Sequence, residues 1–198
     1  MIIHRIAKKI SMELKTVQQI AAIAQAKKPA FSVPWRPALM KYAELYKLAS
    51  AGCEMADPCM LAAIVARESG GQNILQHGVS PGPRCGVGLC QITYGVSWAN
   101  ISQPSYPGYG DLFDPLVNLK VAAHCFLEPA LERFPGNHRA AFDAYNLGLS
   151  SVAQEIADAI SPDAWTTDND YGISVLTDWI NFSAASMGLA VEWSSYTG

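Results

Sequence analysis

The chain has 198 residues, of which 50% are hydrophobic, a composition that supports a folded core and excludes a disordered protein. Its 14 basic and 17 acidic side chains give a net charge of −3, so the chain as a whole offers no electrostatic basis for binding nucleic acid. The longest apolar runs, such as residues 60–66, are far shorter than the roughly 20 residues that a membrane-spanning helix requires.

Residues 1–28 differ in charge from the rest of the chain, because they carry six basic side chains against Glu13 alone. Apolar residues recur every three or four positions from Ile3 to Ala24, which predicts an amphipathic helix. This helix either packs on its own domain with solvated lysines or contacts a membrane surface or an anionic polymer. The prolines of residues 28–37 indicate a linker, so we divide the chain into an arm with linker, 1–36, and a domain, 37–198.

From Pro37 onward the pattern is helical, and helix starts such as Asp57-Pro58 and Asp114-Pro115 combine a capping residue with proline at the first helical position. The predicted helices span 37–51, 58–68, 115–134, 138–145, 149–160 and 173–187, and Pro129 is expected to kink the third. Between residues 70 and 113 the periodicity fails, which predicts a long irregular loop that builds a site. The expected fold class is therefore mainly α.

The five cysteines, an odd number, match no common zinc pattern, so we expect no metal and no cofactor. Buried reduced thiols are the favoured interpretation. The alternative is a disulfide that closes a short loop, either Cys53 with Cys59 or Cys85 with Cys90.

Glu68 ends the inward-facing stripe of the predicted helix 58–68, after Leu61, Ile64 and Val65. Burial disfavours the ionised form of a carboxyl group, so a glutamate at this place can keep its proton near neutral pH and act as a general acid. The alternative is a glutamate at a helix end whose side chain simply reaches water.

The stretch from Cys85 to Gly110 contains no charged residue but several aromatic ones. Tyr94, Trp98 and Tyr106 are interleaved there with amide and hydroxyl side chains. Flat rings that stack on sugars, beside groups that bond to sugar hydroxyls, are typical of a neutral carbohydrate cleft. The same aromatic residues are also compatible with anchors that hold a loop to the core.

Four short motifs together resemble the catalytic domain of soluble lytic transglycosylases and goose-type lysozymes. They are Glu68-Ser69, Gly88-Leu89-Cys90-Gln91-Ile92, Asp114-Pro115 with Asn118, and Ala144-Tyr145-Asn146-Leu147-Gly148. The resemblance covers about residues 40–180 and implies a lysozyme-like helical domain that cleaves the β-1,4 glycan of peptidoglycan, with Glu68 as the catalytic acid. Cys90 departs from the methionine usual in the family, and the loop from Glu68 to Gly88 is longer than is typical.

The resemblance also implies roles for the residues around the acid. Ser69 would support the helix end or the glutamate, while Gln91, Ile92 and Tyr94 would line the cleft. Tyr145 and Asn146 would orient the acid and contact the sugar that carries the scissile bond.

Carboxylates are scarce near the predicted acid, since none occurs between Glu68 and Asp111. A glycosidase that hydrolyses its substrate with two carboxylates needs a second one close to the acid, so this scarcity favours a mechanism with a single carboxylate. Asp111 remains a possible second acid, which would make the protein a muramidase. We interpret Asp114 as a helix cap and expect Asp143 to lie at the surface.

The expected function is that of a peptidoglycan lytic transglycosylase. The alternatives are a hydrolytic lysozyme of goose type and, less favoured, a lysozyme-fold binding protein without activity. Arg5, Lys8 and Lys9 interrupt the first apolar stretch, so we predict no signal peptide. We therefore expect synthesis in the cytoplasm and action at the cell wall, as a phage endolysin or virion-associated lysin or, alternatively, as an enzyme exported by a secretion system.

Overall fold

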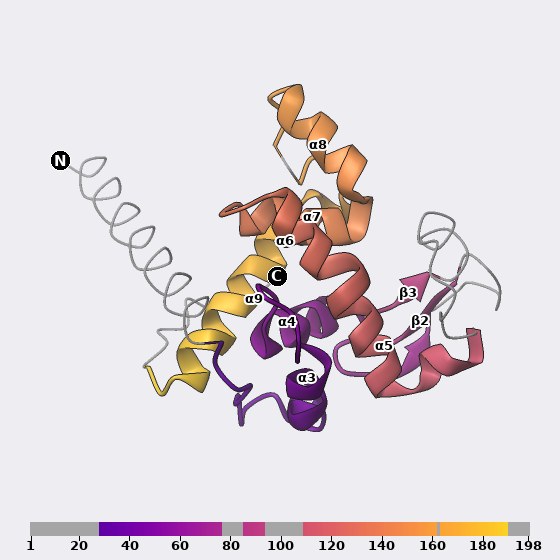
Figure 1. The fold of residues 1–198 in the computed structure, drawn as a ribbon, viewed down its shortest axis with the longest axis vertical. Helices are drawn as coiled ribbons and strands as arrows, with labels where there is room; N and C mark the ends of the chain where they lie inside the picture. The colour runs from indigo at the N-terminus through magenta and orange to yellow at the C-terminus, as the bar shows by residue number, and fades with distance from the viewer. Residues whose placement is uncertain (1–27, 77–84, 94–108, 162, 190–198) are drawn as a thin grey trace.

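A computed structural model describes residues 28–76, 85–93, 109–161 and 163–189. These residues form a mainly helical domain, as predicted. They also form one small sheet, whose strands lie within the stretch 70–113 that was predicted to be an irregular loop. Figure 1 shows α8 projecting from one end, the sheet at one side, and α9 running beside α4. No helix within the described ranges has the length and apolar character needed to cross a membrane.

The elements follow the predicted order, with shifted ends. The helices are α2 (Pro37–Met40), α3 (Ala43–Ala49), α4 (Pro58–Glu68), α5 (Pro115–Val121), α6 (Glu128–Arg133), α7 (His138–Leu147), α8 (Leu149–Ala157) and α9 (Tyr171–Ser186). Shorter 3-10 turns are η1 (Tyr109–Phe113) and η3 (Thr167–Asn169), and η2 (Ala122–Leu127) is a π-helical turn. The strands are β1 (Ile74–Leu75), β2 (Gly86–Gly88) and β3 (Ile92–Thr93).

The predicted helix 37–51 is split into α2 and α3. The chain turns at Tyr42, whose N–H donates to the Leu39 carbonyl at 3.0 Å. Both of these side chains are buried, so the turn lets each of them reach the core.

Helix α4 forms the centre of the domain. Asp57 accepts hydrogen bonds from the N–H groups of Cys59 at 2.7 Å and Met60 at 2.9 Å, and this cap with Pro58 starts the helix where predicted. All residues from Pro58 to Val65 are buried. A helix that is apolar all round must be covered on every side, and α9, α3 and α2 pack against it.

The predicted helix 115–134 follows a continuous path through α5, η2 and α6. The irregularity expected as a kink at Pro129 lies instead in the turn before this proline. In η2 the Glu128 N–H bonds to the Ala123 carbonyl, one residue further back than in an α-helix. Proline lacks an N–H group and crowds the preceding turn, so the wider π turn lets Pro129 sit in the first turn of α6.

The segment expected to be a linker is part of the packed domain. Phe31 and Val33 are buried, and the Phe31 ring makes edge contacts with Tyr46 at 5.1 Å and Phe182 at 5.5 Å between centroids. The linker interpretation of residues 28–36 is therefore wrong for this part of the segment, because its apolar residues between the prolines are core residues. The predicted arm helix lies in residues outside the described ranges.

The sheet is antiparallel in the order β1-β2-β3, with Ile74 opposite Gly88 and Gly86 opposite Thr93. Asn118 of α5 is fully buried and holds the turn after β2. It accepts from the Cys90 N–H at 2.8 Å and donates to the Val87 carbonyl at 2.8 Å. Gly88 has φ +76°, and a Cβ at this position would overlap the Asn118 amide, so the motif needs glycine here.

The surface position predicted for Asp143 is wrong. Its side chain is fully buried between α7 and α9, where it accepts from the Gly172 N–H at 2.8 Å. Periodicity placed it on another side of α7 than Tyr145, but that side is covered by α9. All five cysteines are free thiols.

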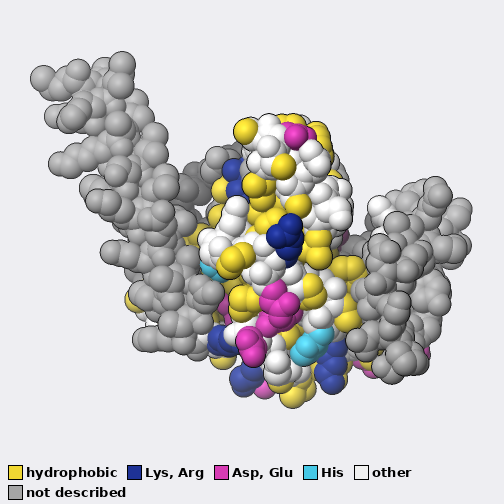
Figure 2. Space-filling model, turned by 45° about the horizontal axis from the view of Figure 1, so that its top comes forward, with side chains coloured by type: hydrophobic (Ala, Val, Ile, Leu, Met, Phe, Trp, Pro, Cys, Tyr) yellow, Lys and Arg dark blue, Asp and Glu magenta, His cyan; other side chains and the backbone are white. Residues whose placement is uncertain are grey.

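Acidic and basic side chains lie close together over the described part of the face in Figure 2, with hydrophobic side chains between them. The described surface in that view therefore presents mixed charge.

Candidate active site

Glu68 is the last residue of α4, at the point where the buried helix opens onto a cavity. Its side chain is only partly exposed. Burial raises the pKa of the Glu68 carboxyl from 4.5 to about 7, and this effect outweighs the hydrogen bond from Tyr171 and the charge of Arg67, which lower it. The carboxyl group can therefore hold a proton near neutral pH.

Tyr171, at the start of α9, touches the acid directly. Its hydroxyl donates to Glu68 Oε1 at 2.5 Å, and its side chain is almost fully buried. The Arg67 guanidinium lies 5.8 Å from the centre of the Tyr171 ring and pairs with Asp170 Oδ1 at 2.7 Å. These contacts hold the end of α4 against the start of α9.

Ser69 connects the end of α4 to the turn between β2 and β3. Its hydroxyl lies 2.7 Å from the Leu89 carbonyl and 3.3 Å from the Val65 carbonyl. The Ser69 side chain therefore fixes the end of α4, where Glu68 lies, relative to the turn between β2 and β3.

A cavity of about 250 Å³ lies beside the acid. Five residues predicted for the site lie around it, and three further residues complete it. Its lining consists of Glu68, Gln76, Gln91, Ile92, Thr93, Phe126, Tyr145 and Asn146. Glu68 is the one acid in this described lining, and the other polar groups are amides and hydroxyls that suit a neutral ligand.

Gln91 lines the cavity and also braces its wall. Its backbone has φ +47°, and its side-chain amide donates to the Ile74 carbonyl at 3.0 Å and the Gly88 carbonyl at 2.7 Å. The amide nitrogen of Gln91 is therefore committed to the carbonyl groups of the sheet.

Tyr145, which the resemblance implied would orient the acid together with Asn146, lies in the last turn of α7. Its hydroxyl donates to the Cys90 carbonyl at 2.9 Å, and its ring meets Phe126 edge-on at 5.8 Å between centroids. Phe126 comes from the π turn η2, so this irregular turn contributes an aromatic wall to the cavity. The hydrogen bond to Glu68 comes from Tyr171 instead.

A comparison with protein families matches residues 48–167, more than half of the chain, to the transglycosylase SLT domain. The chain belongs to this family. The match confirms the resemblance to lytic transglycosylases and their lysozyme-like helical fold, and it indicates transglycosylase-type activity on peptidoglycan. Comparisons with curated proteins and with solved structures gave no match.

The matched range of the SLT domain includes every residue that lines the cavity, but it ends before Tyr171. Two described residues that were predicted for the site, Ser69 and Asp111, are not among the lining residues, and Asp111 is exposed. Tyr94, also predicted for the site, lies outside the described residues.

Sequence reasoning missed Gln76, Thr93, Phe126 and Tyr171. Tyr171 lies 103 residues from Glu68 and stands at the start of a helix like many buried tyrosines, so no local signal indicates the contact. Thr93 follows the predicted Gln91 and Ile92 directly, and its place at the end of that motif was the one available signal.

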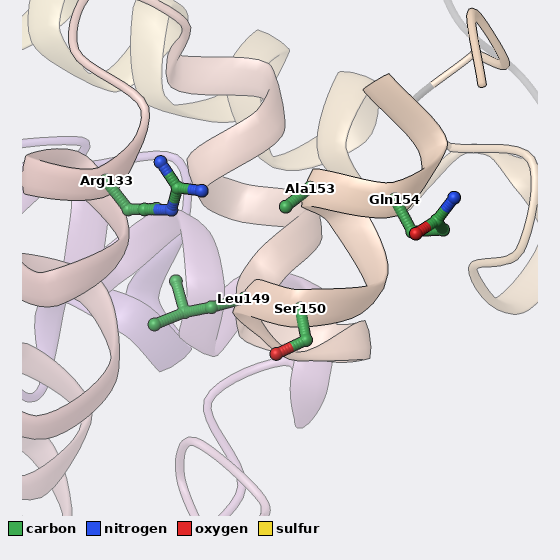
Figure 3. Close-up of a pocket in the computed structure, with 5 residues that line it drawn as sticks. All are labelled: Arg133, Leu149, Ser150, Ala153 and Gln154. Carbon is green, nitrogen blue, oxygen red and sulfur yellow. The ribbon is translucent and has the colours of Figure 1, made fainter. Parts of the chain in front are cut away.

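A second cavity of the SLT domain, about 320 Å³, lies between α6 and α8 and shares no residue with the first. Figure 3 shows Leu149 and Arg133 approaching the same space from two helices, beside Ser150, Ala153 and Gln154. Its lining has no acid that could donate a proton, so the smaller cavity with Glu68 is the candidate active site. Across the described ranges, no three His, Cys, Asp or Glu side chains converge as metal ligands.

Proposed function

We propose that the chain is a peptidoglycan lytic transglycosylase that cleaves the MurNAc-β-1,4-GlcNAc bond with Glu68 as its one acid and base. The observation that carries the proposal is a largely buried carboxyl group at the edge of a cavity whose described lining holds no second acid, and burial raises the pKa of this carboxyl group to about 7. Ser69 supports the end of the helix, and Gln91, Ile92, Tyr145 and Asn146 bind the glycan. Tyr94 is proposed as a further sugar contact.

The reaction moves one proton out and back. Glu68 donates its proton to the bridging oxygen while the bond from that oxygen to C1 of MurNAc breaks. The N-acetyl group of MurNAc stabilises the positive charge at C1. The Glu68 carboxylate then takes the proton from the 6-hydroxyl, whose oxygen bonds to C1 and closes a 1,6-anhydro ring. No water is consumed, and the enzyme ends as it began.

The Tyr171 hydroxyl supports both halves of this cycle. It donates to one carboxylate oxygen and leaves the other Glu68 oxygen to exchange the proton. A single donor stabilises the ionised acid after the first step without lowering its pKa so far that the proton is lost before it.

Mass spectrometry of digested peptidoglycan tests the proposal. Anhydro-ended muropeptides, lighter by one water than reducing ends, are the expected products. Reducing ends would indicate a hydrolytic lysozyme and direct attention to Asp111, and an absence of cleavage would indicate a binding protein. Glu68→Gln, purified in parallel, controls for contaminating hydrolases because it preserves the size of the side chain.

We also propose that residues 1–28 contact a membrane surface or an anionic polymer. The support is their charge, six basic side chains against one acidic. Lys28 donates to the Cys53 carbonyl at 2.5 Å and Phe31 lies in the core, so a clean deletion must stop at residue 27. That deletion should reduce lysis of intact cells but spare digestion of purified sacculi; equal losses would argue against the contact.

Finally, we propose that the enzyme acts at the cell wall as a phage endolysin or virion-associated lysin. Full-length protein produced inside bacteria should then cause lysis only after the inner membrane is permeabilised. Lysis without permeabilisation would favour the alternative of an exported bacterial enzyme.

A further inference from the structure

The first turn of α9 is capped by two acids that are distant in the sequence. Asp170, the residue before the helix, makes no capping hydrogen bond with its side chain. Instead the Gly172 N–H lies 2.8 Å from Asp143 Oδ1 and 2.6 Å from Asp163 Oδ1, and the Ile173 N–H donates to Asp163 Oδ2 at 3.3 Å. Free N–H groups at a helix start favour acceptors, so the two carboxyl groups replace the usual cap.

The two acids have different surroundings, although both are buried. Arg139 donates to Asp163 Oδ2 at 2.7 Å, and buried Glu155 of α8 also faces Asp163. Desolvation and the adjoining Asp163 raise the pKa of Asp143. Asp163 is desolvated too, yet hydrogen bonds from Asp143, Gly172 and Arg139 lower its pKa overall. The close approach of the two carboxyl groups therefore favours the ionised form of Asp163, which Arg139 neutralises, and disfavours the ionised form of Asp143.

Asp143 and Gly172 fit each other closely. A Cβ on residue 172 would overlap the Asp143 carboxyl group. No positive φ is involved, so the need for glycine comes from Asp143 alone. The start of α9 is thus shaped around this one acid.

The same contacts hold both sides of Tyr171. The Tyr171 N–H donates to Thr166 Oγ1 at 3.3 Å, and the next peptide N–H, of Gly172, is held by the acid pair. Between these two anchors, the Tyr171 side chain reaches Glu68 Oε1 at 2.5 Å. A shift of α9 along its axis would carry the hydroxyl away from the acid.

We propose that Asp143 is a positioning residue, which with Asp163 fixes the Tyr171–Gly172 peptide and thereby holds the Tyr171 hydroxyl on Glu68. Asp143 touches no substrate and acts only through Tyr171. The proposal rests on the proposed function, since it assigns a role to the contact that supports the acid. Two of the residues involved, Tyr171 and Gly172, lie beyond the range that the family matches.

The test measures the pKa of Glu68 in the full-length protein by ¹³C NMR of labelled glutamate carboxyl groups, with Glu68→Gln to assign the signal. Tyr171→Phe removes a donor to the carboxylate, so the pKa should rise by roughly one unit. Asp143→Ala should raise it in the same direction, by roughly half as much. The groups that otherwise act on Glu68, Arg67, Tyr145 and Cys90, stay unchanged.

Combining Asp143→Ala with Tyr171→Phe tests whether Asp143 acts on Glu68 through Tyr171. If Asp143 acts through Tyr171, then Asp143→Ala adds nothing in the Tyr171→Phe background. Asp143→Asn should keep the wild-type value, because its amide oxygen can still accept from the Gly172 N–H and its amide nitrogen can donate to Asp163. An unchanged Glu68 pKa in Asp143→Ala, with only a lower melting temperature, overturns the proposal, and so does full additivity with Tyr171→Phe.

Gly172→Ala supplies an independent variant if Asp143→Ala does not fold. The added methyl group pushes the Asp143 carboxyl group away from residue 172, so the pKa of Glu68 should rise in this variant as well. No such rise is expected when Tyr171→Phe is already present. An unchanged pKa of Glu68 in Gly172→Ala overturns the proposal. The NMR readout needs no turnover. If the pKa of Glu68 rises in these variants but the wild-type protein releases no anhydro products, the proposed function alone is rejected. If the wild-type protein releases anhydro products but the pKa of Glu68 does not change in the variants, the positioning role alone is rejected.

Discussion

The two ends of α4 each carry a carboxyl group whose pKa is raised by burial, to about 6 at Asp57 and to about 7 at Glu68. Asp57 is fully buried and accepts from the Cys59 and Met60 N–H groups and from Trp179 Nε1 at 3.0 Å. Glu68 accepts from Tyr171 and faces a cavity.

The two acids differ in how many hydrogen bonds their carboxylate oxygens already accept from the protein, rather than in their pKa. Both Asp57 oxygens are engaged by donors of the protein itself, so the group serves the fold. Glu68 accepts one hydrogen bond from Tyr171 and lines a cavity that a substrate can enter. A raised pKa therefore marks buried acids in general, and the cavity separates the catalytic candidate from the structural one.

The largest expected effect is on catalysis at the Glu68 end. Glu68→Gln cannot donate a proton, so the turnover of peptidoglycan should fall by roughly 10²–10⁴-fold, the range typical of a general acid. The melting temperature should not fall. Rates of muropeptide release measured beside a thermal melt check this, and near-normal release would mean that another residue is the acid.

The opposite end of α4 should respond in stability. Asp57→Ala removes the helix cap and leaves the buried Trp179 N–H without its acceptor, so the free energy of unfolding should fall by about 2–4 kcal/mol. Denaturant unfolding measures the loss. The turnover number per folded molecule should stay close to wild type; a catalytic loss as large as that of Glu68→Gln would erase the contrast between the two ends.

Local sequence signals predicted α4 well. Asp57-Pro58 marks its start, and Glu68-Ser69-Gly70 marks its end, so the helix that carries the acid was found with its bounds. The motif Gly88 to Ile92 was singled out by the family resemblance, and the structure places it at a turn beside the acid, where Gly88 and Gln91 have positive φ.

Contacts between distant segments could not be predicted in this way. Tyr171 and Asp143 act through partners far along the chain, and helical periodicity says nothing about which side a later helix will cover. Phe31 was assigned to a linker because prolines flank it, although an aromatic residue in such a segment packs wherever the core has room. Local chemistry indicated the acid, and tertiary packing selects the groups that hold it.

The pH dependence of the reaction reports the protonation state of Glu68. The free enzyme needs protonated Glu68, so kcat/KM should be level below about pH 7 and fall about tenfold for each pH unit above it. Initial rates on purified sacculi between pH 5 and 9 measure this decline of kcat/KM. A decline that already begins near pH 4.5, the ordinary pKa of a glutamate, would mean that Glu68 is solvated rather than buried.

The smallest expected effect is the stability of Glu68→Gln as a function of pH. The folded pKa of Glu68 is raised to about 7 above an ordinary value of 4.5, so burying the ionised group costs stability. This cost is absent below pH 4.5, grows as the pH rises to 7, and is complete above it. Because the group opens onto the cavity, Glu68→Gln should be more stable than wild type by only about 1 kcal/mol at pH 8, and equal to it at pH 4. Unfolding curves at both values check the sign, and a variant that is less stable at pH 8 would mean that the Tyr171 contact outweighs the cost of burial.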